Sequence, residues 1–285
     1  MIKLSVFEVC RESAYAKINL HLNVLPRRED GYHDIESVFI KVNLCDDLLV
    51  TKNDKPGCVV LCSNMNLPKE NTITRAYDVF CAKTGVHCGV EVRLEKRIPS
   101  QAGLGGGSSD GAAMLRALNS LFKTNLSQQD FAEMALSIGS DVPFFVYNFK
   151  FAIITGRGEV IQPLSQGRDL HFVIVLCNEG VSTLEAYTTF DKVPLRNCAL
   201  SLRSLKNEFE NEPRNWRFSN SFLPIVEQKV PQVRKNIAML LDYDAEFACM
   251  SGSGSACFGV FSTAQQAKNV TKTFLDQGIN AVYAG

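Results

Sequence analysis

The sequence predicts a two-lobed α+β protein, and three observations lead to that class. The chain has 285 residues, about twice the length of a typical domain, so two lobes of ordinary size fit it. Hydrophobic residues make up 46% of the chain and charged residues 21%, which provides enough apolar material for a sizeable core. Strands and helices alternate without an obvious βαβ repeat, and this favours α+β over a doubly wound sheet.

The first predicted strand covers residues 15–25, where apolar and polar side chains alternate. Because successive side chains of a strand point to opposite faces, one face of this strand is polar and could line a cleft. That face carries Lys17, Asn19, His21 and Asn23. Residues 35–42, 59–62 and 90–94 are further strand candidates.

Helical patterns follow these strands. Residues 71–83 predict a helix that stops at Gly85, and residues 109–122 predict a helix buried on most sides. Ser127 begins a capped helix that ends at Gly139. Pro, Ser, Gln and Gly cluster between Pro163 and Arg168, which predicts lobes of residues 1–165 and 166–285. In the second lobe we expect strands at 171–176, 246–250 and 256–261 and helices at 183–190, 225–241 and 264–275.

Charge and hydropathy exclude several classes of partner. Thirty basic residues balance thirty acidic ones, so we expect binding to neither nucleic acid nor an anionic membrane. No stretch approaches the roughly 20 apolar residues of a membrane span, and the start, with Glu8 and Glu12, does not resemble a signal peptide. The ten cysteines form no Cys-x-x-Cys pair, which favours reduced thiols over a zinc site. We therefore expect a cytoplasmic protein.

A glycine-rich stretch lies between a predicted strand and a predicted helix. Glycines allow positive φ, and backbone N–H groups can then converge on an anion beside the positive end of the helix. Serine hydroxyls there could bind phosphate oxygens or a magnesium ion. The stretch is neither a Walker A loop nor a clean dinucleotide fingerprint. A plain flexible loop is the alternative, but this many glycines and serines between apolar elements favour phosphate binding. The candidate residues are Gly103, Leu104, Gly105, Gly106, Gly107, Ser108 and Ser109.

Residues 99–109 resemble the central phosphate-binding motif of the GHMP kinases. Three more segments resemble motifs of that superfamily: residues 14–20, 139–144 and 251–256. The resemblance implies an N-terminal lobe like ribosomal protein S5 domain 2 and a C-terminal ferredoxin-like lobe. It also implies ATP as phosphoryl donor and Mg2+ as metal.

Within that superfamily, the chain is most similar to kinases of non-mevalonate isoprenoid precursor biosynthesis, whose substrate is a cytidine diphosphate-linked methylerythritol. The similarity lies in residues 16–20, 30–33, 70–71, 75–76 and 181–187. It implies phosphorylation of a free hydroxyl, at position 2 of the methylerythritol, by ATP. A monomer and a dimer both remain open.

The resemblance also implies residue roles. Asp141 corresponds to the general base, and Lys17 would steady the charge between the hydroxyl and the γ-phosphoryl group. Tyr32 and Tyr187 correspond to aromatic residues that stack on cytosine, and His33 to a residue that hydrogen-bonds the base. The remaining assignments are Asn19 to the substrate, Asn71 and Lys96 to the adenosine of ATP, and Ser108 to magnesium.

The residues by themselves leave other interpretations open. Asp141 is a natural N-cap of a short helix, Lys17 could be a solvated lysine on an edge strand, and each tyrosine could be ordinary packing. Two departures stand out: residues 219–222 lack the family's Asn-Asp pair, and Asp110 stands where some relatives carry Asn. Another GHMP kinase, of homoserine or mevalonate type, and a catalytically silent GHMP-fold ligand sensor are the alternative functions.

Overall fold

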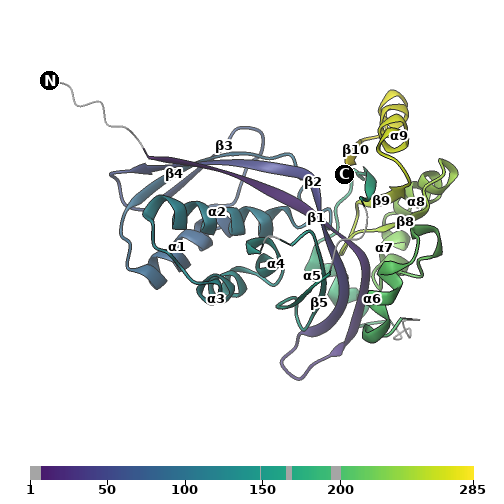
Figure 1. Ribbon diagram of the computed structural model, residues 1–285, viewed down its shortest axis with the longest axis horizontal. Helices are drawn as coiled ribbons and strands as arrows, with labels where there is room; N and C mark the ends of the chain where they lie inside the picture. The colour runs from purple at the N-terminus through teal and green to yellow at the C-terminus, as the bar shows by residue number, and fades with distance from the viewer. Residues whose placement is uncertain (1–7, 148, 165–168, 194–199) are drawn as a thin grey trace. The chain divides into compact units, whose positions relative to one another are not determined.

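The computed structural model describes residues 8–147, 149–164, 169–193 and 200–285, and these form two compact units (Figure 1). The first unit draws on the described residues of Met1–Ala16, Cys45–Ile98 and Gly106–Asn148. The second draws on those of Lys17–Leu44, Pro99–Gly105 and Phe149–Gly285. The predicted lobe boundary at 165/166 lies outside the described residues and stays a prediction.

Two long strands, β1 (Val9–Arg27) and β2 (His33–Asn53), contribute residues to both units. In the first unit β3 (Cys58–Cys62) pairs in parallel with β4 (Gly89–Glu95), and β4 pairs antiparallel with β2. Side chains of β4 alternate: Val90, Val92 and Leu94 are buried, whereas Arg93 is exposed. The buried face is the one that the helices of this unit cover, which explains the alternating pattern (Figure 1).

Four helices complete the first unit. They are α1 (Thr72–Thr84), α2 (Gly106–Phe122), α3 (Gln128–Ile138) and α4 (Val142–Val146). The predicted burial of α2 is confirmed, since most of its residues are inaccessible to solvent. It begins at Gly106, three residues earlier than predicted, so the last glycines of the glycine-rich stretch are helical. The predicted stop of α1 is confirmed by Gly85, a C-cap with φ 70°.

The second unit holds a four-stranded antiparallel sheet. Its strands are β7 (His171–Val175), β8 (Phe247–Met250), β9 (Cys257–Phe261) and β10 (Ala281–Ala284). In space they stand in the order β10-β7-β9-β8. Taken in chain order this is fourth, first, third, second, with helices between the first and second strands and between the third and fourth. That is the ferredoxin-like arrangement that the resemblance implied.

In the second unit the sequence predicts the helices near residues 183–190 and 264–275 correctly and misses the helix over residues 202–210. The helices of this unit are α5 (Thr183–Phe190), α6 (Leu202–Glu210), the short 3₁₀ helix Pro213–Asn215, α7 (Leu223–Lys229), α8 (Gln232–Asp242) and α9 (Ala264–Asp276). The prediction of one helix over 225–241 is wrong, because Val230 and Pro231 separate α7 from α8. Proline lacks an N–H and disfavours helical angles at the preceding residue.

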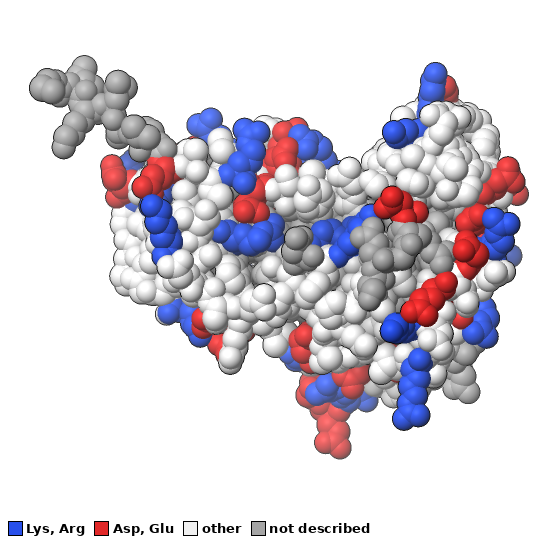
Figure 2. All heavy atoms as spheres, in the orientation of Figure 1, with Lys and Arg blue, Asp and Glu red and all other residues white. Residues whose placement is uncertain are grey.

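The same unit contains a hairpin that the sequence did not reveal. It consists of β5 (Phe151–Thr155) and β6 (Val160–Pro163), and β5 also pairs antiparallel with the first part of β2. The charge balance is visible on the surface, where basic and acidic side chains are interspersed on the face shown in Figure 2. Among the described residues, no helix has both the length and the apolar character needed to cross a bilayer.

His21, on the polar face of β1, is fully buried. Its Nδ1 lies 3.1 Å from the backbone N–H of Ser219 and accepts a hydrogen bond from it, which suits a neutral ring. Burial lowers the pKa of His21 from 6.5 to about 4. Its contribution to stability is therefore complete above pH 6.5 and is lost as the pH falls through 4.

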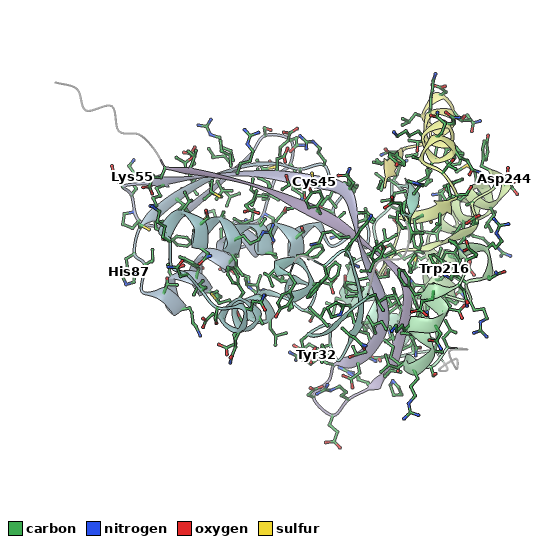
Figure 3. All side chains as sticks on the ribbon, in the orientation of Figure 1. Tyr32, Cys45, Lys55, His87, Trp216 and Asp244 are labelled. Carbon is green, nitrogen blue, oxygen red and sulfur yellow. The ribbon has the colours of Figure 1, made fainter. Side chains whose placement is uncertain are left out.

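We predict that this one group removes about 3 kcal/mol of unfolding free energy on acidification. His21→Asn retains an acceptor for the Ser219 N–H but cannot bind the proton, so urea unfolding of this variant should depend less on pH below 6.5. His87→Asn, at an exposed residue (Figure 3), is the control and should keep the parental pH dependence. Identical slopes for the parent and the His21 variant would contradict this assignment.

Candidate active site

Lys17 is buried on β1, not solvated at a sheet edge. Its side chain is 3% exposed, and its Nζ donates to Asn19 Oδ1 at 2.6 Å and to the carbonyl oxygen of Gly103 at 3.0 Å. The ammonium also lies 4.9 Å from the centroid of the Phe39 ring. Asn19 in turn donates from Nδ2 to Ser37 Oγ at 3.0 Å, so the amide oxygen that faces Lys17 is fixed. These contacts orient the ammonium and exclude the solvated-lysine interpretation.

The beginning of the glycine-rich stretch packs against the C-terminal glycine motif. Ser251 Oγ donates to the Gly103 carbonyl oxygen at 2.9 Å, and the Leu104 carbonyl accepts the Lys17 N–H at 2.9 Å. Gly103 has φ +76°, and a Cβ there would lie 2.0 Å from the Ser251 carbonyl oxygen. Glycine is therefore required both for its backbone angles and for the close approach.

The later residues of the stretch form the start of α2 in the first unit. Gly106 does not have a positive φ, so the expectation of glycine-only angles there is wrong. Close packing demands the glycine instead: a Cβ would lie 2.9 Å from Ile98 Cγ2 and 3.3 Å from Lys96 Nζ. Gly105, like Gly103, has a positive φ, 71°. Gly106 is buried and Gly107 is exposed at this helix start, and the first N–H groups of a helix favour an anion.

Lys96 is held behind this helix start by two carboxylates. Its Nζ pairs with Asp46 and, at 2.8 Å, with Asp110, and all three side chains are buried. Asp46 Oδ1 also accepts the backbone N–H of Ile98 at 2.7 Å. Burial raises the pKa of Asp110 to about 7, although the Lys96 ammonium opposes the shift. The Lys96 ammonium is thus committed to ion pairs, and its predicted contact with adenosine stays a prediction.

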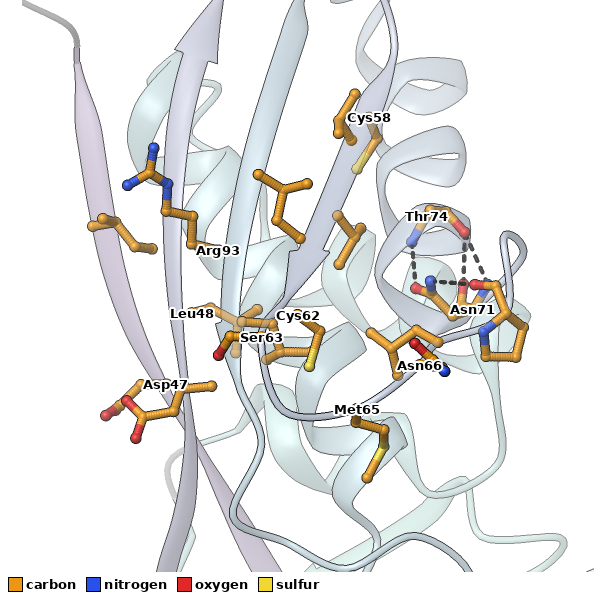
Figure 4. Close-up of a pocket in the computed structure, with 18 of the residues that line it drawn as sticks. Asp47, Leu48, Cys58, Cys62, Ser63, Met65, Asn66, Asn71, Thr74 and Arg93 are labelled. Atoms are coloured by element: carbon orange, nitrogen blue, oxygen red, sulfur yellow. Dashed lines mark hydrogen bonds between the residues drawn. The ribbon is translucent and has the colours of Figure 1, made fainter.

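A cavity of about 1120 Å³ opens beside the strands of the first unit (Figure 4). Its wall includes β3, the segment 63–69, Arg93 of β4 and Asn71, the residue predicted to contact adenosine. Asn71 is also the N-cap of α1: its Oδ1 accepts the N–H groups of Ile73 and Thr74 at 2.9 and 3.2 Å. The cavity joins apolar strand side chains to a few fixed polar groups, as nucleoside pockets do.

Asp141 occupies the N-cap position of α4, but its side chain makes no capping hydrogen bond. Its φ and ψ, −85° and −13°, are helical, whereas a residue whose side chain caps a helix is usually extended. Pro143 in the first turn supplies the pre-set angle that starts the helix without such a cap. The structure therefore does not support the capping role that the spacing suggests.

Two of the three residues predicted to hold cytosine lie together in the second unit. The His33 and Tyr187 ring centroids are 5.3 Å apart, and Phe222 packs edge-on against Tyr187. His33 Nδ1 lies 2.7 Å from the Leu25 carbonyl oxygen, so it must carry the hydrogen of that bond. His33 Nε2 lies 3.0 Å from Asp191 Oδ1. Both ring nitrogens therefore face acceptors already, and a base that bonds to this ring must displace Asp191.

Tyr32 lies in the turn between β1 and β2 and is 54% exposed (Figure 3). The Arg157 guanidinium carbon is 4.4 Å from the centroid of its ring, a cation–π contact. An exposed aromatic face in this position is available for stacking. Sequence reasoning missed Arg157 and Asp191. For Asp191 there was a clue, because it lies four residues after Tyr187, and residues three or four positions apart on a helix are neighbours.

The available side chains determine how this protein could hold a metal ion. No group of three or more His, Cys, Asp or Glu side chains suited to a metal ion occurs in the described part of the chain. Mg2+ in kinases is commonly held by one or two protein oxygens together with substrate phosphates. Ser108, half-buried at the start of α2, fits such a minor ligand, and the helix start fits the phosphates.

Two family models match the chain over these same elements. Residues 71–149 match the GHMP kinases N terminal domain, and residues 201–280 match the GHMP kinases C terminal domain. Together they cover more than half of the chain. The protein belongs to the GHMP kinases.

Curated relatives refine the position within that family. The chain is 41% identical to a 4-diphosphocytidyl-2-C-methyl-D-erythritol kinase of Treponema pallidum subsp. pallidum, over 91% of this chain and 92% of the relative. It is 37% identical to a kinase of the same name from Chlorobium phaeobacteroides, over 92% of both chains. The resemblance to this branch of the GHMP kinases is thereby confirmed.

Solved structures agree. A crystal structure of 4-(cytidine 5'-diphospho)-2C-methyl-D-erythritol kinase superposes with a TM-score of 0.78 at 30% identity, covering 96% of this chain and 98% of the other. Homoserine kinase from Cytophaga hutchinsonii gives a TM-score of 0.77 at 18% identity, over 99% and 96% of the two chains. The second likeness shows a shared GHMP kinase fold alone.

The packing at Gly106 yields a test of the helix start. Gly106→Ala places a Cβ against Ile98 and should cost about 1–3 kcal/mol in urea unfolding. The matched control is Gly107→Ala, whose Cβ would meet only Thr72 Oγ1 at 3.8 Å and should not destabilise the GHMP kinase. Gly106→Val should in addition abolish ATP binding in titration calorimetry. Equal stability of the two alanine variants, or parental ATP affinity of the valine variant, would refute this account.

Proposed function

We infer that this chain is an ATP-dependent kinase that phosphorylates the 2-hydroxyl of 4-diphosphocytidyl-2-C-methyl-D-erythritol, a step of non-mevalonate isoprenoid precursor biosynthesis. The observation that carries this inference is 41% identity, over nine tenths of both chains, to a relative of that name. The buried Lys17 and the His33–Tyr187 pair support it from the geometry. We also propose a cytoplasmic location and no binding to nucleic acid.

Binding in our proposal uses three surfaces. Tyr32 and Tyr187 stack on the cytosine, and His33 orients it once Asp191 is displaced. The cavity beside Asn71 takes the adenosine. The glycine-rich stretch, residues 103–109, takes the phosphates through backbone N–H groups. When bound, ATP supplies the transferred phosphoryl group and Mg2+ offsets phosphate charge, with Ser108 as one oxygen ligand.

The chemical roles fall to two side chains. Asp141, whose carboxylate does not cap α4, accepts the proton of the attacking hydroxyl. Lys17, whose ammonium is held by Asn19 and the Gly103 carbonyl, stabilises negative charge between the hydroxyl and the transferred group. Because phosphoryl transfer has a loose transition state, orientation and charge stabilisation supply most of the acceleration.

The decisive experiment measures ADP release by the purified protein with three alcohols: the cytidyl substrate, homoserine and mevalonate. We expect release with the first alone. Release with homoserine or mevalonate would support the alternative kinases, and release with none would support a silent ligand sensor.

Tyr187→Ala should raise KM for the cytidyl substrate by one to two orders of magnitude, from roughly 1–3 kcal/mol of lost stacking, with KM for ATP unchanged. Tyr243→Ala, which loses a contact with Phe274 and a hydrogen bond from Gln277, is the control.

The proton transfer is tested at Asp141. Asp141→Asn should lower kcat by about 10²–10⁴-fold and leave the unfolding free energy within about 1 kcal/mol, because Asn keeps the shape of the side chain and suits an N-cap position nearly as well as Asp. Asp130 is the matched control: its carboxylate accepts from Ser127 in the capping box of α3, so Asp130→Ala should cost stability and leave kcat intact. Lys17→Met should also lower kcat, and the double variant should lose less than the product of the two singles. If Asp141→Asn keeps the parental kcat, Asp141 is not the general base.

A further inference from the structure

Two cysteines of the second unit meet at one backbone carbonyl. Cys177 follows β7 by two residues and is half-buried, whereas Cys257 begins β9 and is fully buried. Val175 is paired with Cys257 across the two strands, which brings Cys177 close to it. The Ser255 carbonyl oxygen lies 3.2 Å from Cys177 Sγ and 3.7 Å from Cys257 Sγ. The two sulfur atoms therefore lie beside one carbonyl oxygen, and a second one, that of Val233, lies 3.5 Å from Cys257 Sγ.

The surroundings of Cys177 favour its thiolate. A hydrogen bond from the Cys257 thiol, with a smaller contribution from Asn236, lowers the pKa of Cys177 to about 7 against the effect of burial. Asn236 is itself 98% buried on α8, and its Nδ2 donates to Cys177 Sγ at 3.3 Å. The reverse holds for Cys257, whose pKa is raised by its bond to Cys177 and by burial, and for Cys58, whose pKa burial raises to about 12. Since the thiolate is the nucleophile, Cys177 is set apart from such cysteines.

We propose that Cys177 is a modification site for low-molecular-weight disulfides and that Cys257 is its resolving thiol. In the first step the Cys177 thiolate attacks a disulfide RSSR, forms a Cys177–SR bond and releases RS⁻. In the second step Cys257 gives its proton to RS⁻, attacks the Cys177 sulfur and releases the second RS⁻. Two protein thiols are oxidised and one disulfide is reduced to two thiols.

The bond would alter the loop that contacts Lys17. Cys177 loses its hydrogen bond to Ser255, and Ser255 belongs to the glycine motif 251–256. In the same motif Ser251 Oγ binds the Gly103 carbonyl, and a Cβ on Gly252 would lie 3.3 Å from Lys17 Nζ. Oxidation should therefore reversibly reduce kinase activity, a consequence that rests on the proposed function. The modification itself does not depend on that function.

The test treats the intact protein with oxidised glutathione at neutral pH and maps the modified peptides by mass spectrometry. Cys198, outside the described residues, is replaced by serine in every protein, the parent included. Cys177 should react at least about tenfold faster than Cys58. The parent should then lose two hydrogens in a Cys177–Cys257 crosslink, and Cys257→Ser should stop at the glutathione adduct on Cys177. Asn236→Ala should slow the first step.

Activity is followed in parallel, with dithiothreitol added at the end. Cys177→Ser should keep its activity in oxidised glutathione, and Cys88→Ser, at a half-buried residue outside the cavity wall, should lose activity like the parent. Reaction of Cys177 no faster than that of Cys58 would overturn the modification site. A parent that stops at the adduct, as Cys257→Ser does, would overturn the resolving role. A parent that has no kinase activity before treatment, but forms the Cys177–Cys257 crosslink normally on treatment, would refute the proposed function alone.

Discussion

The Gly103 carbonyl oxygen is the point on which the arrangement around Lys17 depends. It accepts from the Lys17 ammonium at 3.0 Å and from the Ser251 hydroxyl at 2.9 Å, so three motifs far apart in the chain meet at one atom. Ser251 Oγ also accepts the Asn19 N–H at 3.2 Å, which closes the ring. A buried ammonium needs such partners, because an unpaired charge in this environment would be costly. The lysine is therefore oriented before any ligand arrives.

Regular elements were predictable where one periodicity dominated. Residues 15–25 alternate between apolar and polar side chains, and the strand is there. The helix α1 begins one residue after the start of the predicted range 71–83 and ends before Gly85, as predicted. Two of the wrong or missed elements each have a physical cause. The apolar pattern of 225–241 continues across Pro231, and pattern alone does not weigh the missing N–H. The hairpin of β5 and β6 is short and owes its place to pairing with β2, a long-range contact.

The candidate site residues came from motif resemblance and stay predictions, whereas their contacts came from the structure alone. Lys17 and Asp141 came from motif resemblance, and their surroundings decide against solvation for the first and against capping for the second. The place of Asp191 four residues after Tyr187 was a clue, but its contact with His33 joins residues far apart in sequence and could not be foreseen. The same is true of Asp46 with Lys96. Such pairs depend on tertiary packing, and no periodicity in the sequence reports it.

Asn71 has two structural roles, and this limits which substitutions the cavity wall can accept. Its Oδ1 caps α1 through Ile73 and Thr74, and its Nδ2 donates to the Pro68 carbonyl at 3.0 Å, while the residue also lines the cavity wall. Loss of an asparagine cap typically costs about 0.5–2 kcal/mol. A drug that bound the Asn71 amide would contact a residue whose substitution weakens α1. Resistance arising at that position would carry a folding defect with it.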